Sequence, residues 1–258
     1  MKGSPPWHDE ESVLAALHDG RGEGVKIAVL DSGIEFAHPA LSGGKFDDDW
    51  RIAEQDGVVR ALPGKGEDIF GHGTAIAGII HKLAPDASIG SFQVLNPGLG
   101  ARNRLIRSGA LFAIERGFQI LNCSFGCRDD GGRHMLTYKQ WVDEAYRRHV
   151  HLVTACNNED ADIQEWPGSF YSSLNVEQLS ELNESWAYRA NRMVEFAAGS
   201  MGELPWRDGG YRNVSGSSFA APIVSAYLAR LIGRFPDLTV VQAKGLLQKH
   251  ARILTETT

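Results

Sequence analysis

The stretch VKIAVLDSG, residues 25–33, joins the two features that decide the fold: an apolar run interrupted only by Lys26 and a polar turn directly after it. An apolar run of this length is typical of a strand buried on both faces of a parallel sheet. Ligands and catalytic groups of parallel sheets gather at the carboxyl ends of the strands, where Asp31 would lie. Asp-Ser-Gly is also an ordinary turn signal. Asp31 is therefore a first candidate for a functional residue.

Similar apolar runs recur along the chain and alternate with helical patterns. Between the runs, apolar residues three and four positions apart form stripes within 105–114, 141–149 and 224–232, as in helices with one buried face. The alternation predicts an α/β fold in which helices cover both faces of a mostly parallel central sheet. The further predicted strands are Ser88–Leu95, Phe118–Cys123, Val150–Ala155 and Met193–Ala197.

Composition narrows the class of protein. The 258 residues suit a single domain spanning 1–258, and 26 Lys and Arg against 32 Asp and Glu give a net charge of −6. This mild acidity argues against nucleic acid as the partner. No apolar run approaches the roughly 20 residues of a membrane span. Met1–Glu10 does not resemble a secretion signal, and three cysteines without metal-ligand spacing suit a reducing compartment, so we expect a cytoplasmic location.

Two more short motifs contain residues of catalytic type. Gly71-His72-Gly73-Thr74 precedes an apolar helical stretch. Because glycine stands on both sides of His72, the backbone around it has little side-chain bulk. In Gly216–Pro222, Ser218 lies at the start of a predicted helix whose first turn includes Pro222. A serine there is a simple helix cap or a nucleophile beside the positive helix end. The chain order Asp, His, Ser differs from that of α/β-hydrolases.

Together, these motifs resemble those of the subtilisin-like serine proteases (subtilases, peptidase family S8), from Leu14 to Pro222. The resemblance implies a single-domain, three-layer subtilisin-like fold and a serine endopeptidase acting on protein or peptide substrates. The segments that carry it are VKIAVLDSGIEFAHPAL (25–41), GHGTAIAGII (71–80), ILNCSFG (120–126), VTACNNE (153–159) and SGSSFAAP (215–222).

The resemblance also implies roles for individual residues. Ser218 would attack the peptide carbonyl, His72 would take its proton, and Asp31 would orient the imidazole. Asn158 would donate to the oxyanion, with Asn157, at a position that is usually glycine, as the alternative one residue earlier. Substrate would bind as an extended strand between two segments, Gly98-Leu99-Gly100 and Ser124-Phe125-Gly126.

One position suggests the specificity of the protease. Glu165 stands before Trp166-Pro167-Gly168, where the resemblance places the floor of the primary specificity pocket, and Glu159 would lie near its rim. A carboxylate in a partly desolvated pocket favours a cation. We therefore expect Arg or Lys on the acyl side of the cleaved bond; the alternative is a solvated acidic loop.

Other departures from the subtilase pattern concern metal binding, regulation and the type of reaction. Ala40 replaces an aspartate of a calcium site found in many subtilases, so we expect no metal and no cofactor. The acidic run Asp47–Asp49 is expected to be a solvated turn, with cation binding as the alternative. No inhibitory pro-domain is recognisable, so either the enzyme works inside the cell without one or the sequence is part of a longer precursor. An intracellular protease would be restrained by narrow specificity or by a regulatory or delivering partner. A peptide ligase or macrocyclase, with Ser172–Arg189 as a covering insertion, and a catalytically inactive peptide-binding module are the alternatives.

Overall fold

The computed structural model describes residues 9–46, 48–128 and 132–254. Residues 1–8, which enter the expectation that no secretion signal is present, and Asp47 of the acidic run lie outside the described residues.

A ten-stranded sheet runs through the described part of the molecule in the order β14-β10-β11-β9-β7-β5-β1-β4-β2-β3. All neighbours from β11 to β2 are parallel, whereas β10 and β3 pair antiparallel with β11 and β2. The sheet strands are β1 (Lys26–Asp31), β2 (Asp49–Gln55), β3 (Val58–Pro63), β4 (Ser88–Gln93), β5 (Ile120–Cys123), β7 (His151–Ala155), β9 (Ser173–Gln178), β10 (Trp186–Tyr188), β11 (Phe196–Ala198) and β14 (Arg252–Ile253).

The other strands pair in two small antiparallel two-stranded sheets, β12 with β13 and β6 with β8. Two 3-10 turns, η1 (Pro39–Leu41) and η2 (Ser180–Leu182), lie in connections. The bounds of the small strands are β6 (Cys127–Arg128), β8 (Glu165–Trp166), β12 (Glu203–Trp206) and β13 (Gly210–Asn213).

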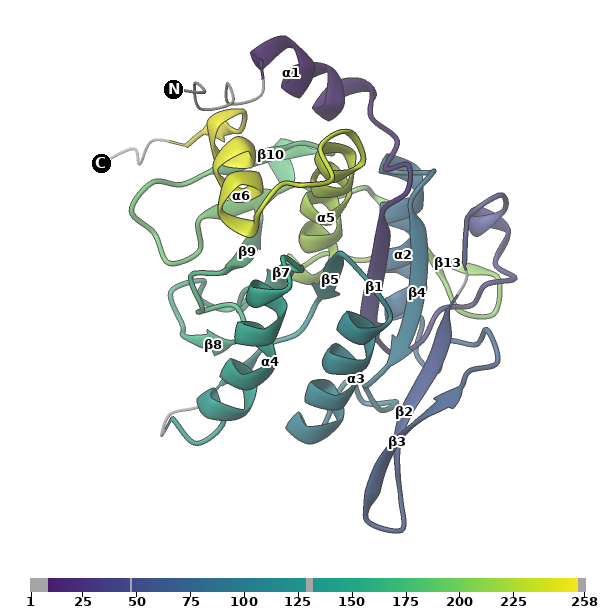
Figure 1. Cartoon of the computed structure of the whole chain (residues 1–258). Helices are drawn as coiled ribbons and strands as arrows, with labels where there is room; N and C mark the ends of the chain where they lie inside the picture. The colour runs from purple at the N-terminus through teal and green to yellow at the C-terminus, as the bar shows by residue number, and fades with distance from the viewer. Residues whose placement is uncertain (1–8, 47, 129–131, 255–258) are drawn as a thin grey trace.

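Helices pack on both faces of the sheet (Figure 1). On β1, Ile27 and Val29 join the core shared with α1, α2, α5 and α6, whereas Ala28 and Leu30 join the core shared with α3 and α4. This alternation explains why the whole run is apolar. The helices are α1 (Glu10–Asp19), α2 (His72–Leu83), α3 (Asn103–Glu115), α4 (Met135–Arg147), α5 (Ser217–Arg234) and α6 (Val240–Lys249).

The layered arrangement confirms the predicted α/β fold with a mostly parallel central sheet covered on both faces. β1 lies between β4 and β5, so the strands that follow β1 in the chain are added first on one side of it and then on the other. Such a switch in strand order opens a crevice at the carboxyl end of the strand. Asp31, the last residue of β1, lies at that end.

Two sequence predictions need correction. The strand expected at Met193–Ala197 is β11, which starts at Phe196, because Met193 is half exposed and Asn191 has a positive φ of 63°. The segment Ser172–Arg189 is not an insertion over the site. It forms β9, η2 and β10, and β9 lies between β7 and β11 in the sheet.

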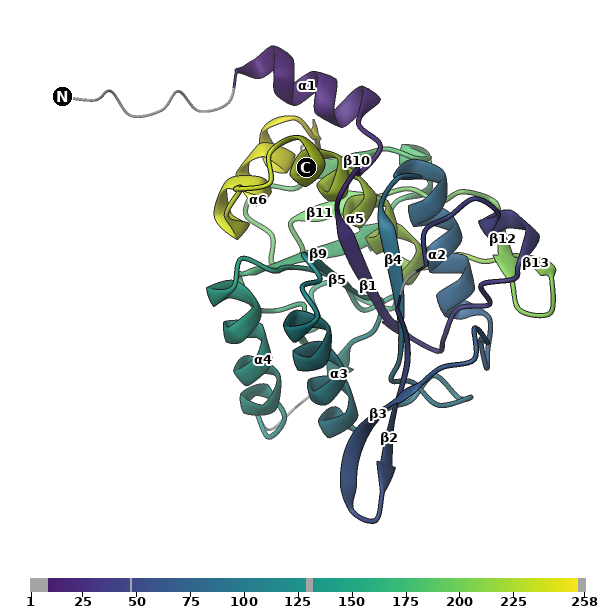
Figure 2. The same ribbon diagram turned by 45° about the vertical axis from the view of Figure 1, so that its right-hand side comes forward.

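The hairpin of β2 and β3 projects beyond the body of the molecule (Figure 2). Elsewhere the fold is closely packed around the two cores. No helix of the described ranges is both long and apolar enough to cross a membrane. Cys123, Cys127 and Cys156, all described, form no disulfide with one another.

Candidate active site

Asp31 and His72 meet at the carboxyl end of β1 and the start of α2. The imidazole Nδ1 lies 2.9 Å and 3.0 Å from the two carboxylate oxygens of Asp31. Both side chains are buried, and the N–H of Ser32 also donates to Asp31 Oδ1 at 2.7 Å. With Nδ1 held by the carboxylate, Nε2 is the ring nitrogen left for chemistry.

Asp68, which no sequence motif singled out, anchors the start of α2. Its Oδ1 accepts bonds from Ser32 Oγ (2.8 Å) and from the N–H groups of Phe70 and Gly71 (2.9 and 2.7 Å). Its Oδ2 accepts from the N–H and hydroxyl of Thr74 (2.8 and 2.7 Å). A carboxylate at a helix N-terminus satisfies N–H groups that have no partner within the helix. Asp68 therefore fixes the first turn of α2 and, with it, the place of His72.

Gly71, directly before His72, is required by the backbone. Its φ is 111°, in the region that favours glycine, and a Cβ there would clash with the indole of Trp206. The glycine before His72 is thus explained by conformation and by close packing.

The surroundings of His72 set its proton affinity. Burial alone would lower the pKa of His72, but the charge of Asp31 and its hydrogen bond, helped by the charge of Asp68, raise the pKa above its ordinary value of 6.5. The imidazolium is therefore favoured in this site, as a proton-accepting base requires once it has taken a proton.

Ser218 lies in the first turn of α5, and the next residue, Phe219, contacts His72. The His72 imidazole and the Phe219 ring are 5.1 Å apart between centroids, which places the imidazole over this turn. The Ser218 hydroxyl donates to the carbonyl of Ser124 (3.2 Å) and, within the described ranges, forms no hydrogen bond with His72. A serine hydroxyl reorients by rotation between staggered positions.

Pro222 lies inside α5 rather than in its first turn, which corrects the sequence prediction. Proline has no N–H, so the carbonyl of Ser218, four residues earlier, lacks its usual helical partner. The Ser124 hydroxyl donates to that carbonyl instead, at 2.8 Å, and itself accepts from Asn122 Nδ2 at 2.9 Å. Ser218 and Ser124 are therefore joined by two hydrogen bonds.

The two adjacent asparagines have different partners. Asn158 Oδ1 accepts from the N–H of Ser217 (2.8 Å), and within the described chain its Nδ2 group makes no hydrogen bond. Asn157 is engaged at both ends: Nδ2 donates to Glu165, and Oδ1 accepts from the N–H groups of Glu159 and Asp160. The geometry thus leaves the carboxamide of Asn158, not of Asn157, with a donor group beside Ser218.

Glu165, in β8, lies against the second predicted substrate segment. One carboxylate oxygen accepts from Asn157 Nδ2 (2.9 Å), and the other is so close to Gly126 that a Cβ there would clash with it. Gly126 is exposed, while Ser124 is buried and Phe125 is partly buried between them. The carboxylate therefore lies between Asn157 and this segment.

The first predicted substrate segment is not an extended edge. Gly98-Leu99-Gly100 forms a compact turn in which Asn96 Oδ1 accepts from the N–H groups of Gly98 and Gly100. Leu99 has a φ of 57°, and Asn96 N–H donates to the Gly100 carbonyl. These N–H groups and the Gly100 carbonyl are therefore bonded within the turn, and the role of the segment in substrate binding stays a prediction.

A cavity of about 470 Å³ lies next to this turn, between β2 and residues 94–105. Leu95, which lines it, donates its N–H to the main-chain carbonyl of Asp31, so the cavity lies near the end of β1. Gly100 and Ala101 also line it, whereas Gly98 and Leu99 are not among its lining residues.

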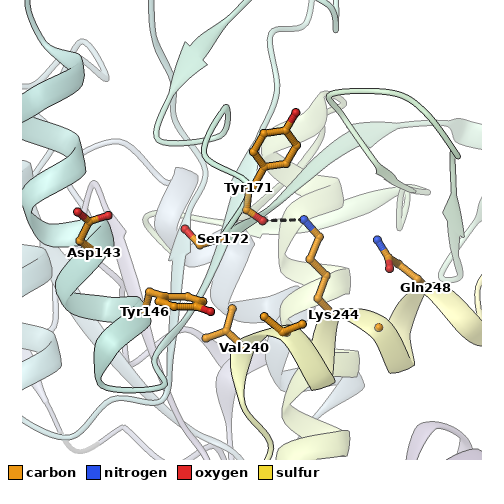
Figure 3. Close-up of a pocket in the computed structure, with 9 residues that line it drawn as sticks. Asp143, Tyr146, Tyr171, Ser172, Val240, Lys244 and Gln248 are labelled. Carbon is orange, nitrogen blue, oxygen red and sulfur yellow. Dashed lines mark hydrogen bonds between the residues drawn. The ribbon is translucent and has the colours of Figure 1, made fainter.

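A separate groove of about 490 Å³ lies between α4 and α6 (Figure 3). The Lys244 ammonium crosses it to donate to the Tyr171 carbonyl at 2.9 Å. Its lining includes Tyr146, Tyr171 and Val240 and none of the predicted site residues. Across the described ranges, no three His, Cys, Asp or Glu side chains form a group able to hold a metal ion.

Comparisons with known proteins agree with this geometry. A model of the Subtilase family, Peptidase_S8, matches residues 22–258. Subtilisin E of Bacillus subtilis (strain 168) is 26% identical over 271 residues, covering 97% of this chain and 67% of its own. An alkaline protease of Alkalihalobacillus alcalophilus is 27% identical over 272 residues, covering 100% of this chain and 67% of its own.

Solved structures show the same fold. A cold adapted subtilisin-like serine proteinase superposes with a TM-score of 0.73 at 23% identity, over 90% of this chain and 83% of its own. Sphericase superposes with a TM-score of 0.74 at 24% identity, over 90% and 84%. The chain therefore belongs to the Subtilase family of serine peptidases.

Proposed function

We propose that the protein is a serine endopeptidase that hydrolyses peptide bonds of protein substrates through an acyl-enzyme intermediate. The observation that carries this proposal is the buried pair of Asp31 and His72, which lies over the helix turn that contains Ser218. Relatives named subtilisin and alkaline protease support it at the level of the family.

Each residue has one task in the proposed reaction. The Ser218 hydroxyl leaves the Ser124 carbonyl and turns toward His72 Nε2, which takes its proton as the Ser218 oxygen bonds to the peptide carbonyl carbon. His72 then gives that proton to the leaving amine, and water releases the acyl group by the same steps. Catalytic hydrogen bonds often form only once substrate is bound.

The developing oxyanion would be stabilised by Asn158 and the start of α5. The Nδ2 group of Asn158 is available because its Oδ1 is held by the N–H of Ser217. The positive end of α5 adds to the effect. Removal of one such donor typically costs about 100- to 1,000-fold in kcat.

We further propose selectivity for Arg or Lys on the acyl side of the cleaved bond. Glu165 supports it, because one carboxylate oxygen is held by Asn157 while the other faces the bare backbone at Gly126. No ion pair of Glu165 occurs among the described residues. A basic side chain entering there would complete a charge-assisted hydrogen bond.

A cytoplasmic location and a regulatory or delivering partner remain part of the proposal. The absence of disulfides among Cys123, Cys127 and Cys156 suits a reducing compartment. The ligase alternative loses its candidate cover, since residues 173–178 are a strand of the central sheet. The binding-module alternative does not explain why Asp31 and His72 are buried as a pair.

A fluorophosphonate probe tests the proposed function. We expect covalent labelling of the wild type and of a control, Ser108→Ala on α3, and none of Ser218→Ala. An unlabelled wild type would contradict the proposal. With labelling established, the masses of the products of a peptide substrate separate hydrolysis, which adds one water, from ligation.

Matched peptides with Arg, Lys, Leu or Phe before the cleaved bond test the selectivity. The wild type should cleave after Arg and Lys fastest, and Glu165→Gln should lose about tenfold or more of that preference. Faster cleavage after Leu or Phe in the wild type would overturn the assignment of Glu165.

A further inference from the structure

The backbone directly before Ser218 is bound by two carboxamides from different parts of the chain. Gln178 Oε1 accepts the N–H of Gly216, and Asn158 Oδ1 accepts the N–H of Ser217. Gly216 and Ser217 are the cap and first residue of α5, so both N–H groups lack partners within the helix. The family resemblance led to Asn158 but gave no role to Gln178.

The turn at Gly216 depends on these two hydrogen bonds because its backbone can adopt an unusually wide range of conformations. Gly216 has φ 135° and ψ 160°, a conformation that is essentially restricted to glycine. Glycine also has the largest range of alternative conformations. Without a partner for its N–H, the peptide before Ser217 could therefore move and carry the start of α5 with it.

Gln178 is well placed to provide that partner. It is the last residue of β9, paired in register with Ala198 of β11, so its backbone is held inside the sheet. Its side chain spans from the sheet to the turn, which lies 38 positions later in the chain.

Folding stability gives little reason for a glutamine at this place. The Nε2 atom of Gln178 is buried and makes no hydrogen bond within the described ranges. The bond gained by Oε1 is offset by the lost hydration of Nε2, because an unpaired buried donor is unfavourable. The net effect of the side chain on stability is therefore small, whereas its effect on the position of Gly216 is direct.

We propose that Gln178 is a positioning residue for catalysis, holding Gly216 so that Ser218 and the Asn158 amide keep their relative places. The link to Asn158 passes through Ser217, whose N–H sets the direction of the Asn158 carboxamide. The proposal rests on the proposed peptidase function and concerns the same site. A displaced turn slows the chemical step, while substrate binding at Glu165 is unaffected.

The test compares two substitutions of similar length. Gln178→Met keeps the shape and removes the acceptor; Gln178→Glu keeps an acceptor at the same reach. We expect Met to lower kcat about ten- to a hundredfold with KM within about twofold, and Glu to recover most of the loss. Melting temperatures should stay within about 3 °C of the wild type. Gln248→Met, on α6, is the matched control and should behave as the wild type.

A second measurement does not require activity. Hydrogen exchange of the Gly216 amide should be slow in the wild type and in Gln178→Glu, and fast in Gln178→Met. If Met prevents folding, Gln178→Asn, whose carboxamide is one methylene shorter, replaces it with the same expected losses.

Several results would overturn the inference. They are a Met variant with kcat within twofold of the wild type, a loss confined to KM, no recovery with Glu, or unchanged amide exchange. Failure of the peptidase function itself is distinguishable, because the wild type would then not react with the fluorophosphonate probe.

Discussion

At the scale of single residues, the proton affinity of His72 decides the pH range of the proposed chemistry. As a base, the imidazole must be neutral, and its pKa lies above 6.5 because Asp31 outweighs the effect of burial. Below that pKa the imidazolium cannot accept the Ser218 proton, so activity must rise with pH through a value above 6.5.

The pH profile of kcat/KM measures this value in the free enzyme. We expect a midpoint above pH 6.5 in the wild type and a lower one in Asp31→Asn, which also loses about 10⁴-fold in kcat. A wild-type midpoint at or below 6.5 would show that the carboxylate does not govern the imidazole.

At the scale of elements, the start of α5 combines the proposed nucleophile with a break in the helical hydrogen-bonding pattern. Pro222 leaves the Ser218 carbonyl to the Ser124 hydroxyl, which ties α5 to the end of β5. A regular helix would instead bond that carbonyl internally and would not need Ser124. The proline thus lets a loop side chain help to place Ser218.

Pro222→Ala tests this exchange. Alanine supplies an N–H that competes for the Ser218 carbonyl, so we expect α5 to become more stable, raising the melting temperature by about 3 °C. The displaced contact with Ser124 should lower kcat about tenfold. Pro85→Ala, in the turn after α2, is the control and should leave kcat unchanged; an unchanged kcat in Pro222→Ala would refute the role of the proline.

At the scale of the whole molecule, Asp48 connects β1, β2 and the C-terminal end of α3. The prediction that the acidic run is solvated is wrong for Asp48, because this residue is only 3% exposed. Its carboxylate accepts hydrogen bonds from Lys26 (3.2 Å), Trp50 (2.9 Å) and Arg116. Burial alone would raise the pKa of Asp48, but these donors lower it below its ordinary value of 3.8.

The sign of the resulting pH dependence follows from that lowered pKa. The stabilisation is present above pH 3.8 and is lost as pH falls through the folded-state pKa. We expect Asp48→Asn to reduce the free energy of unfolding by about 1–3 kcal/mol at pH 7, and by less in acid. Urea unfolding at several pH values measures it, with Asp56→Asn at the tip of the β2–β3 hairpin as control. An equal loss at all pH values would exclude the charge as the cause.

The sequence alone predicted the features that depend on neighbouring residues or on short motifs. The apolar run before Asp31 predicted a central strand, and the order of Asp31, His72 and Ser218 predicted the family. It failed at β9, whose residues SLNVEQ mix polar and apolar types, because the burial of this strand comes from its place between β7 and β11 and from α5 packed against it. It gave no sign of the turn at Gly98–Gly100, which the side chain of Asn96 closes.

Only the tertiary structure could reveal the residues that hold the site in place. Asp68, Ser124 and Gln178 form hydrogen bonds with residues 36, 94 and 38 positions away in the chain, respectively. Those distances along the chain carry no periodic signal, because the contacts exist only once the sheet order has brought particular strand ends together. The sequence determined which groups can do the chemistry; the order of the strands decided which neighbours keep them in register.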